Sequence, residues 1–217
     1  MSAREIIEHS YDDWVDSTAG AIFDKVMNCG SRTVNIALSG GKSPGPIYTK
    51  LSNMLVESRK LVDVNIFLVD ERNVPTNSEL SNSNLLLSIF PKRLVFPFDP
   101  VTTEAKDYWK IIKKRLFQSK FDIVVLGCGE DGHIASIFPD SQLNKKDSEY
   151  KDFVTCYTSV GVRHTLTLKV IAEARYKIIA INNNPLKHRY FRELKEDITY
   201  PINKIKCIDN TLTIINM

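Results

Sequence analysis

The segment TVNIALSGGKSPGPIYTKL, residues 33–51, decides the fold class that the sequence predicts. Its first part, TVNIALS (33–39), is short, apolar and partly β-branched, which is typical of a strand buried on both faces. From Pro46 to Glu57 the apolar residues recur at the spacing of one helical face. A glycine-rich turn separates these two parts, so the segment predicts a strand, a turn and a helix in that order.

The same alternation of strands and helices continues along most of the chain. Short apolar runs predict further buried strands in VDVNIFLVD (62–70), FDIVVLG (121–127) and YKIIAIN (176–182). Weaker strand patterns occur at 152–158, 164–168, 202–210 and 211–217, helical spacing occurs at 3–28, 81–90, 102–119, 170–174 and 185–194, and 141–152 is polar like an exposed loop. This order predicts an α/β fold in a single domain over residues 1–217: a Rossmann-like, mostly parallel sheet flanked by helices on both faces.

The composition is that of an ordinary globular protein and excludes several other classes. Of the 217 residues, 43% are hydrophobic and 25% are charged, which is enough for a sizeable core and does not suggest disorder. The net charge of +3 is small and no basic patch interleaved with aromatics is evident, so neither nucleic acid nor a membrane surface is an expected partner. No run approaches the roughly 18 apolar residues that would predict a membrane span.

The cysteines and the N-terminal segment bear on metal binding and location. Cys29, Cys128, Cys156 and Cys207 form no CxxC pair and have no histidine at zinc-finger spacing, so no structural metal site is predicted. The first residues, MSAREIIEHSYDDW, lack the apolar centre of a signal peptide. The sequence therefore predicts a cytoplasmic protein with free thiols and without a metal.

The glycine-rich turn contains Gly41-Lys42-Ser43, which also ends a nucleotide-binding P-loop. A P-loop has another glycine where this chain has Ile36, inside the strand, and its helix starts directly, whereas residues 44–46 here are Pro-Gly-Pro. The turn is therefore too short to surround two phosphates of a nucleotide. Its backbone N–H groups still suit a single phosphate, and the alternative is a tight turn that binds nothing.

A second glycine motif, GCGEDGHIASIFP (127–139), follows the strand at 121–127. It matches the G-x-G-x-x-G pattern of dinucleotide-binding proteins. Pro139 would stop the following helix within two turns, however, and the acidic residue nearest the expected spacing, Asp152, precedes a strand. The context therefore argues against dinucleotide binding.

His133 is the stronger feature of this motif. An imidazole in a glycine-rich turn just past a buried strand is placed to meet a ligand, and its unperturbed pKa of about 6.5 allows it to take a proton from water. Glu130 and Asp131 are both near enough in the chain to orient it. In the alternative interpretation, Asp131 only caps a helix and His133 is merely exposed.

Charged residues follow other strands. Asp70, Glu71 and Arg72 end the strand at 62–70, and charges there need a cleft, mutual pairing or a ligand. Arg163 precedes the pattern TLTL, and Lys187 opens the helix after the strand at 176–182. An arginine and a lysine beside a glycine turn can bind a phosphate, although either residue alone is more often a solvated surface charge.

Four segments in order resemble the 6-phosphogluconolactonases, which belong to the sugar-phosphate isomerase and deaminase superfamily. They are SGGKSPGPIYTKL, VDERNVP with SNSNLL, LGCGEDGHIASIFP, and RHTLTL with the helix that carries Lys187, and they extend from about residue 33 to 190. The resemblance implies a Rossmann-like fold and hydrolysis of 6-phospho-D-glucono-1,5-lactone to 6-phosphogluconate in the oxidative pentose phosphate pathway. It also implies no metal or organic cofactor, and the expected oligomeric state is a monomer.

The resemblance assigns a role to each matching position. His133 corresponds to the general base and Asp131 to its partner, while Asp70 and Arg72 line the same cleft. The positions expected near the phosphate are Gly40, Gly41, Lys42, Ser43, Arg163 and Lys187. Either Arg72 or the backbone N–H groups of 129–133 would stabilise the oxyanion, and the sequence leaves both alternatives open.

The chain departs from the family at three places. Val69 and the run Asn182-Asn183-Asn184 stand where glycine is common, and Lys42 stands where serine or threonine is frequent. The sister enzyme, glucosamine-6-phosphate deaminase, carries a glutamate where this chain has Phe138. That difference favours the lactonase over the deaminase, and a non-catalytic sugar-phosphate sensor is a third alternative.

Overall fold

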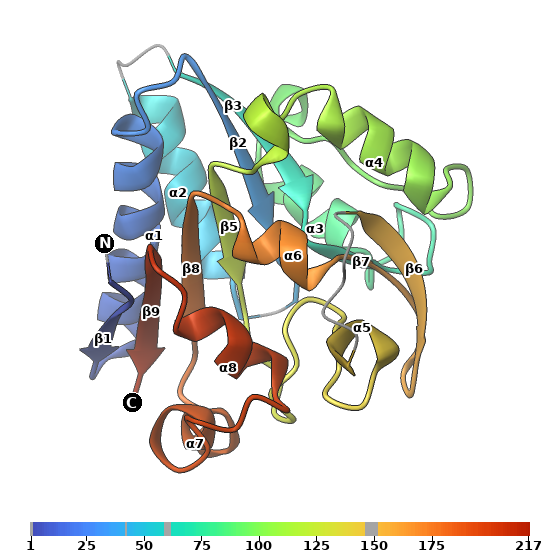
Figure 1. Ribbon diagram of the computed structural model, residues 1–217. Coiled ribbons are helices and arrows are strands. Elements are labelled where there is room, and N and C mark those ends of the chain that lie inside the picture. Colours follow the sequence, from blue (N-terminus) through green and yellow to red (C-terminus); the bar gives the residue numbers. More distant parts are fainter. Residues whose placement is uncertain (1, 42, 59–61, 146–151) are drawn as a thin grey trace.

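The computed structural model describes residues 2–41, 43–58, 62–145 and 152–217. Within these residues, six strands form a sheet in the order β1-β9-β8-β5-β2-β3 (Figure 1), and every neighbouring pair is parallel. The strands are β1 (Arg4–Glu8), β2 (Thr33–Leu38), β3 (Asp63–Leu68), β5 (Ile123–Leu126), β8 (Tyr176–Ile181) and β9 (Thr211–Asn216). The predicted parallel sheet is confirmed.

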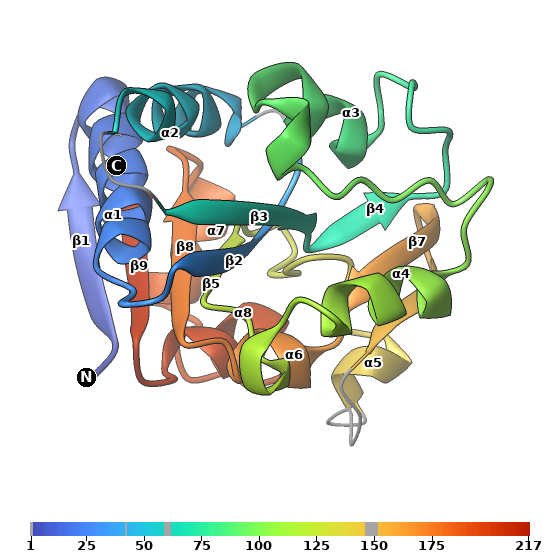
Figure 2. The same ribbon diagram turned by 90° about the horizontal axis from the view of Figure 1, so that it is seen from above.

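A smaller antiparallel sheet extends from the end of β3. It contains β4 (Asp70–Arg72), β7 (Gly161–Leu166) and β6 (Phe153–Thr158), in that order. Val69 alone separates β3 from β4, and it is fully buried. The charged segment that we predicted at the end of one strand is therefore a separate short strand of a second sheet (Figure 2).

Helices cover both faces of the parallel sheet, as predicted. Helices α1 (Tyr11–Met27) and α2 (Gly45–Glu57) lie on one face, and α6 (Leu168–Ala172) and α8 (Pro201–Lys206) on the other (Figure 2). The remaining α-helices of the described residues are α3 (Asn82–Ile89), α4 (Ala105–Lys113), α5 (Gln142–Lys145) and α7 (Pro185–Arg192), and short 3₁₀ turns occur at Lys92–Leu94 and Phe117–Ser119. None of the described helices is long and apolar enough to cross a membrane.

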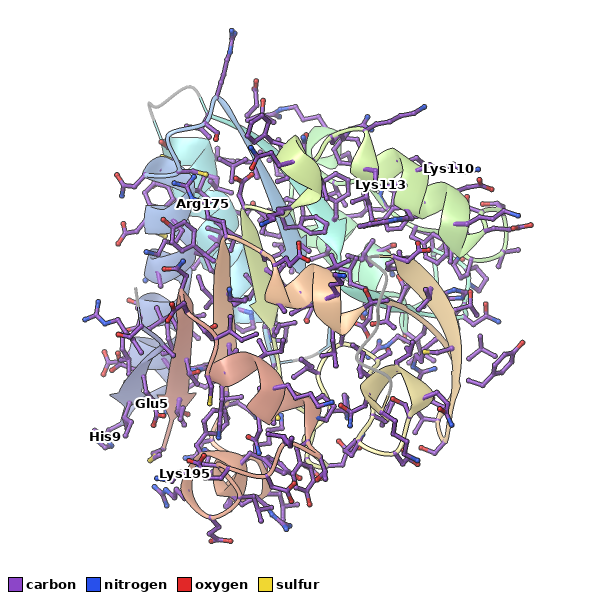
Figure 3. The ribbon with its side chains drawn as sticks, in the orientation of Figure 1. Glu5, His9, Lys110, Lys113, Arg175 and Lys195 are labelled. Atoms are coloured by element: carbon purple, nitrogen blue, oxygen red, sulfur yellow. The ribbon has the colours of Figure 1, made fainter. Side chains whose placement is uncertain are left out.

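Helix α4 shows how apolar spacing places an element. Tyr108, Trp109 and Ile112 are buried, whereas Lys110 and Lys113 lie on the exposed side (Figure 3). The helix packs against β6, so its apolar face covers the smaller sheet. The predicted helix at 102–119 is shorter in the structure because the chain turns after residue 113.

Two predicted elements at the ends of the chain are wrong. Residues 4–8 form the edge strand β1, not a helix, and the segment 202–210, predicted as a strand, begins with helix α8. Pro201 occupies the first position of α8, and Ile202 and Ile205 are buried at helical spacing, which we had interpreted as alternation. In β1, all residues but Glu8 are exposed, so no buried apolar run marks it as a strand.

Two segments predicted around the second glycine motif also differ. The expected helix directly after Gly127 is absent, because residues 127–141 form turns and an isolated bridge. The predicted exposed loop at 141–152 contains α5, and Asn144 is buried there because its amide donates to the carbonyls of Pro139 and Thr199. Of that segment, 146–151 lies outside the described residues.

The order of the strands determines where a site can form. Strands β8, β5, β2 and β3 are neighbours, so their carboxyl ends meet at the same edge of the sheet. From β2 the chain continues to β3 on one side, whereas β5 lies on the other side of β2. Ligands of open α/β sheets bind at such a reversal of strand order, which here lies between β2 and β5.

Candidate active site

A cavity of about 110 Å³ lies at the ends of β2, β4 and β5. Four of the residues predicted for the site share its wall: Gly40, Asp70, Arg72 and His133. The other lining residues are Ser39, Asn82, Gly127, Gly129 and Ala135. The tertiary structure therefore brings together side chains from three separate sequence motifs.

His133 and Asp131 form a hydrogen-bonded pair, with 2.5 Å between imidazole Nδ1 and carboxylate Oδ1. Burial acts to raise the pKa of Asp131, but the hydrogen bond and the charge of His133 outweigh it and hold the pKa below its ordinary value. An ionised carboxylate only accepts hydrogen bonds, so Nδ1 carries the proton. When the imidazole is neutral, the lone pair of Nε2 is available to take a proton from a bound molecule, and the Asp131 carboxylate stabilises the charged ring that results.

Two neighbours restrict the plane of the imidazole. The Phe138 ring lies 4.4 Å from the His133 ring, measured between centroids, at an angle of 32°. Gly129 lies so close that a Cβ atom there would be 2.2 Å from the imidazole atoms Cε1 and Nδ1. Glycine at 129 therefore makes room for the ring, which explains part of the glycine pattern without a dinucleotide.

Asp70 is a buried carboxylate beside this pair. Its Oδ2 accepts a hydrogen bond of 2.7 Å from the hydroxyl of Ser136. Burial raises the pKa of Asp70, while the Ser136 hydroxyl and the charges of Arg72, His133 and Arg163 act in the opposite direction. Asp70 therefore interacts electrostatically with three cationic groups, those of Arg72, His133 and Arg163.

Arg72 and Arg163 lie directly opposite each other in the antiparallel pair β4–β7. Like charges at such a position destabilise a sheet, and burial together with the charge of Arg72 lowers the pKa of Arg163. Each guanidinium donates to a backbone carbonyl, Arg72 to Leu80 at 2.6 Å and Arg163 to Val162 at 3.0 Å. Two adjacent guanidiniums with remaining donors make a binding position for an anion such as a phosphate.

Glu71, between the two cavity residues of β4, has a structural role. Its carboxylate accepts hydrogen bonds from the backbone N–H groups of Arg72, Asn82 and Ser83 and from the hydroxyl of Ser81. The side chain is fully buried, and burial raises its pKa against the effect of these bonds. Glu71 thus satisfies the free N–H groups at the start of α3, which are otherwise costly to bury.

Asn82 is a cavity residue that we did not predict as part of the site. Its amide nitrogen donates to the carbonyl of Asp70 at 2.8 Å, and a Cβ atom on Gly40 would be 1.9 Å from its Oδ1. Two polar atoms of cavity residues, Asn82 Oδ1 and Ser39 Oγ, are buried and have no hydrogen-bond partner among the residues that the structure describes. The segment SNSNLL, which follows the DER strand, was the sequence signal for this position.

Arg163, Gly41, Ser43 and Lys187, which were also predicted to bind the phosphate, are not among the residues that line the cavity. Gly41 and Ser43 lie in the turn between β2 and α2, and Lys42 lies outside the described residues. The Lys187 ammonium donates to Asn182 Oδ1 at 2.8 Å, beyond the end of the neighbouring strand β8. Their role in binding a phosphate stays a prediction.

The three-asparagine run that departs from the family has a local function in this chain. Asn184 caps α7 by accepting from the N–H of Leu186, and its amide donates to Glu130 Oε1 at 2.9 Å. Tyr190 of the same helix donates its hydroxyl proton to the carbonyl of Glu130 at 2.9 Å. Helix α7 therefore holds the loop that carries Asp131 and His133.

No three His, Cys, Asp or Glu side chains of the described residues are grouped so that they could hold a metal ion. The prediction that the site needs no metal or organic cofactor is independent of this observation. It still depends on the resemblance alone.

The fold is that of α/β proteins that bind small molecules at the carboxyl ends of parallel strands. A family model described as glucosamine-6-phosphate isomerases/6-phosphogluconolactonase matches residues 9–214. The chain belongs to this family.

Relatives in this family support the resemblance that the sequence motifs suggested. A 6-phosphogluconolactonase of Chlamydia pneumoniae is 28% identical over 212 residues, which cover 92% of this chain and 79% of the relative. A 6-phosphogluconolactonase of Thermotoga maritima is 28% identical over 204 residues, covering 88% of each chain. The 6-phosphogluconolactonase structure from the same organism has a TM-score of 0.83 at 24% identity over 99% of this chain and 100% of the other.

The fold alone does not separate the lactonases from the deaminases. A monomeric glucosamine-6-phosphate deaminase has a TM-score of 0.80 with this structure at 14% identity, covering 98% of this chain and 97% of the other. The fold therefore does not decide between the two activities, and individual side chains must do so.

Proposed function

We propose that this protein hydrolyses 6-phospho-D-glucono-1,5-lactone to 6-phospho-D-gluconate in the oxidative pentose phosphate pathway. The observation that carries this proposal is the His133–Asp131 pair, which leaves imidazole Nε2 free in a cavity that also contains Arg72. The curated relatives at 28% identity are 6-phosphogluconolactonases. Hydrolysis of a lactone needs an activated water molecule and a group that stabilises the negative oxygen of the intermediate.

In the proposed mechanism, His133 Nε2 accepts a proton from water while the water oxygen forms a bond to lactone C1. The electron pair of the carbonyl double bond moves to its oxygen and gives a tetrahedral oxyanion. When this intermediate collapses, the bond from C1 to the ring oxygen breaks and the ring oxygen takes the proton from His133. Asp131 and Asp70 stabilise the positive charge that the imidazole carries between these steps.

The paired arginines supply the charge that the 6-phosphate requires. Arg72 and Arg163 lie opposite each other across β4 and β7, and Gly40, which follows β2, lines the same cavity as Arg72. A phosphate between these elements neutralises two like charges at once. The substrate is then held at its phosphate end while C1 lies beside His133.

The position of Phe138 favours lactone hydrolysis over deamination. The resemblance places a glutamate of the deaminase at this position, and such a carboxylate would take part in proton transfer. Here an aromatic ring packs on the imidazole at 4.4 Å. An aldose–ketose conversion needs proton transfer at carbon, whereas lactone hydrolysis needs only the activated water.

A coupled assay with 6-phosphogluconate dehydrogenase tests this function. We expect 6-phosphogluconate to form faster with the protein than by spontaneous hydrolysis of the lactone. Release of ammonia from glucosamine 6-phosphate would instead establish the deaminase. Binding of the sugar phosphate without turnover of either substrate would establish the non-catalytic sensor.

Gly129→Ala is expected to lower lactone turnover by about 10²-fold, the effect of displacing a catalytic group by about 1 Å. The added Cβ would lie 2.2 Å from the His133 ring, so the imidazole must move. Steady-state kinetics measures this effect. Gly20→Ala in α1 is the matched control, because a Cβ there meets nothing within 4 Å, and it should leave turnover unchanged.

Asp70→Asn is expected to raise the melting temperature at neutral pH while lowering turnover. Burial raises the pKa of Asp70 above its ordinary value of 3.8, so its contribution to stability is complete below pH 3.8 and is lost as the pH rises through the folded-state pKa. The difference in melting temperature between the Asp70→Asn variant and the wild type should therefore be largest at pH 7.5 and should become smaller as the pH falls toward 4.

Thermal denaturation of both proteins across this pH range measures the difference. Inorganic phosphate in every sample keeps an anion beside Arg72 and Arg163, so the variant differs only in the carboxylate. A wild-type protein that melts at the higher temperature at pH 7.5 would show that the arginines stabilise Asp70 more than burial costs.

A further inference from the structure

The turn that follows the proposed base has an unusual backbone. The N–H of Ile137 donates to the carbonyl of Ile134 at 2.9 Å and closes a tight turn over residues 134–137. Ala135, the second residue of this turn, has a φ of 53°, in the left-handed region that residues with a side chain seldom adopt. Such a conformation persists where its surroundings fix it, and it is frequent at functional sites.

The surroundings of Ala135 do fix it. Ile134 and Ile137 are fully buried on either side. Ser136 is held twice, because its N–H donates to Thr165 Oγ1 at 3.3 Å and its hydroxyl donates to Asp70 Oδ2 at 2.7 Å. Ala135 itself is half-buried and lines the cavity that contains His133.

The hydrogen bonds of the preceding loop engage three of the oxyanion donors that the sequence had left open. The N–H of Gly129 donates to the carbonyl of His133 at 2.8 Å, and that of Gly132 to the carbonyl of Gly129 at 3.1 Å. The N–H of His133 donates to Asp131 Oδ1 at 3.2 Å. Each of these three N–H groups already has a partner within the loop, so it could bind an oxyanion only if that hydrogen bond were broken.

The N–H of Ala135 differs from these groups. No acceptor for it is present among the residues that the structure describes, whereas the N–H groups of Ser136 and Ile137 in the same turn have acceptors. The backbone N–H of a half-buried residue on a cavity wall needs an acceptor from solvent or from a ligand where the protein provides none. Ala135 and His133 are two residues apart and line the same cavity. A molecule that contacts the imidazole of His133 is therefore also near the backbone of Ala135.

We propose that the N–H of Ala135 donates a hydrogen bond to the oxyanion of the tetrahedral intermediate. This inference rests on the proposed lactone hydrolysis. As water oxygen bonds to C1 and His133 takes the proton, the carbonyl electron pair moves to the exocyclic oxygen, and the Ala135 N–H stabilises its charge. When the bond from C1 to the ring oxygen breaks, the exocyclic oxygen forms the carbonyl double bond again and loses its negative charge.

The direct test replaces Ala135 with lactic acid, which exchanges this one N–H for an ester oxygen and keeps the methyl group. Turnover of the lactone is expected to fall by about 10²–10³-fold, the usual effect of removing one oxyanion donor. The KM is expected to change by less than about threefold, because the bond strengthens only in the transition state. The same exchange at the exposed Ala3 is the matched control and leaves turnover unchanged.

Ala135→Gly separates the N–H from the methyl group. Glycine adopts a positive φ freely and retains the N–H, so its turnover should stay within about threefold of the wild type. A larger loss in this variant would assign the role to packing of the methyl group and overturn the proposal.

Amide NMR provides a readout besides activity, including the case in which the ester protein does not fold. The carboxylate of 6-phosphogluconate places oxygen where the oxyanion forms, so saturation with this product should move the Ala135 amide proton downfield. An unmoved amide proton, or an ester variant with turnover within about threefold of wild type, overturns the proposal. Both results leave the proposed hydrolysis standing, whereas a wild-type protein without lactone turnover would refute the function itself.

Discussion

His133→Ala is expected to lower the turnover of 6-phospho-D-glucono-1,5-lactone by about 10²–10⁴-fold, the usual contribution of a general base. Among the described residues that line the cavity, His133 is the only histidine. Its imidazole has a carboxylate partner on Nδ1, and the variant removes it. The KM should change little, because the imidazole acts on water and does not hold the phosphate. Steady-state kinetics in the coupled dehydrogenase assay measures both values.

His9→Ala is the matched control for this experiment. His9 is exposed and lies beside β1, away from the carboxyl ends of β2 and β5 (Figure 3). Its removal should leave turnover unchanged. Near-normal turnover in the His133 variant would contradict the proposed base and would direct attention to Asp70, the other titratable carboxylate on the cavity wall.

Arg163→Gln and Arg72→Gln are each expected to raise the KM for the lactone by about ten- to hundredfold. A hydrogen bond to a charged group contributes about 1.5–3 kcal/mol, and about 1.4 kcal/mol corresponds to a factor of ten. Because the two guanidiniums are opposite each other and share one ligand, the effects of the double variant should not be additive. Arg93→Gln, at an exposed position of the turn Lys92–Leu94, is the control and should not change the KM.

The same variants should change how the protein responds to inorganic phosphate. In its absence, removing one guanidinium relieves the repulsion between the pair but also removes a cation that stabilises Asp70, so the melting temperature should change little. Added phosphate should stabilise the wild type and have a much smaller effect on either variant. An unchanged response to phosphate in both variants would place the phosphate elsewhere, with Lys187 as the next candidate.

Most of the buried elements could be predicted because their chemistry is local. The strands at 33–38, 123–126 and 176–181 are short apolar runs, and such runs are stable only where both faces are covered. The helix predicted at 81–90 is present as α3, and the hydroxyl of Ser81 caps it by accepting from the N–H of Asn84. Element β1 was missed because an exposed edge strand needs no apolar run to form.

The site was predicted in part. The DGH turn and the DER strand provide cavity residues because each motif lies within a few residues of the carboxyl end of a buried strand. Asn82 and Ala135 were missed: the segment SNSNLL was used for the resemblance and as a helix start, and an alanine side chain has no group that indicates ligand binding. Their significance comes from an unpartnered amide oxygen and from a positive φ, which are properties of the packed structure.

The sequence by itself determined the parallel α/β fold and predicted a candidate imidazole in a turn after a buried strand, with Glu130 or Asp131 as its partner. These features depend on apolar runs and on residues a few positions apart in the chain, which are close together in any conformation. Only the tertiary structure decided that Glu71 caps α3 while Asp70 enters the cavity, and that Arg163 lies opposite Arg72. Burial, strand register and hydrogen bonding between distant segments set these roles, and no local pattern of residues specifies them.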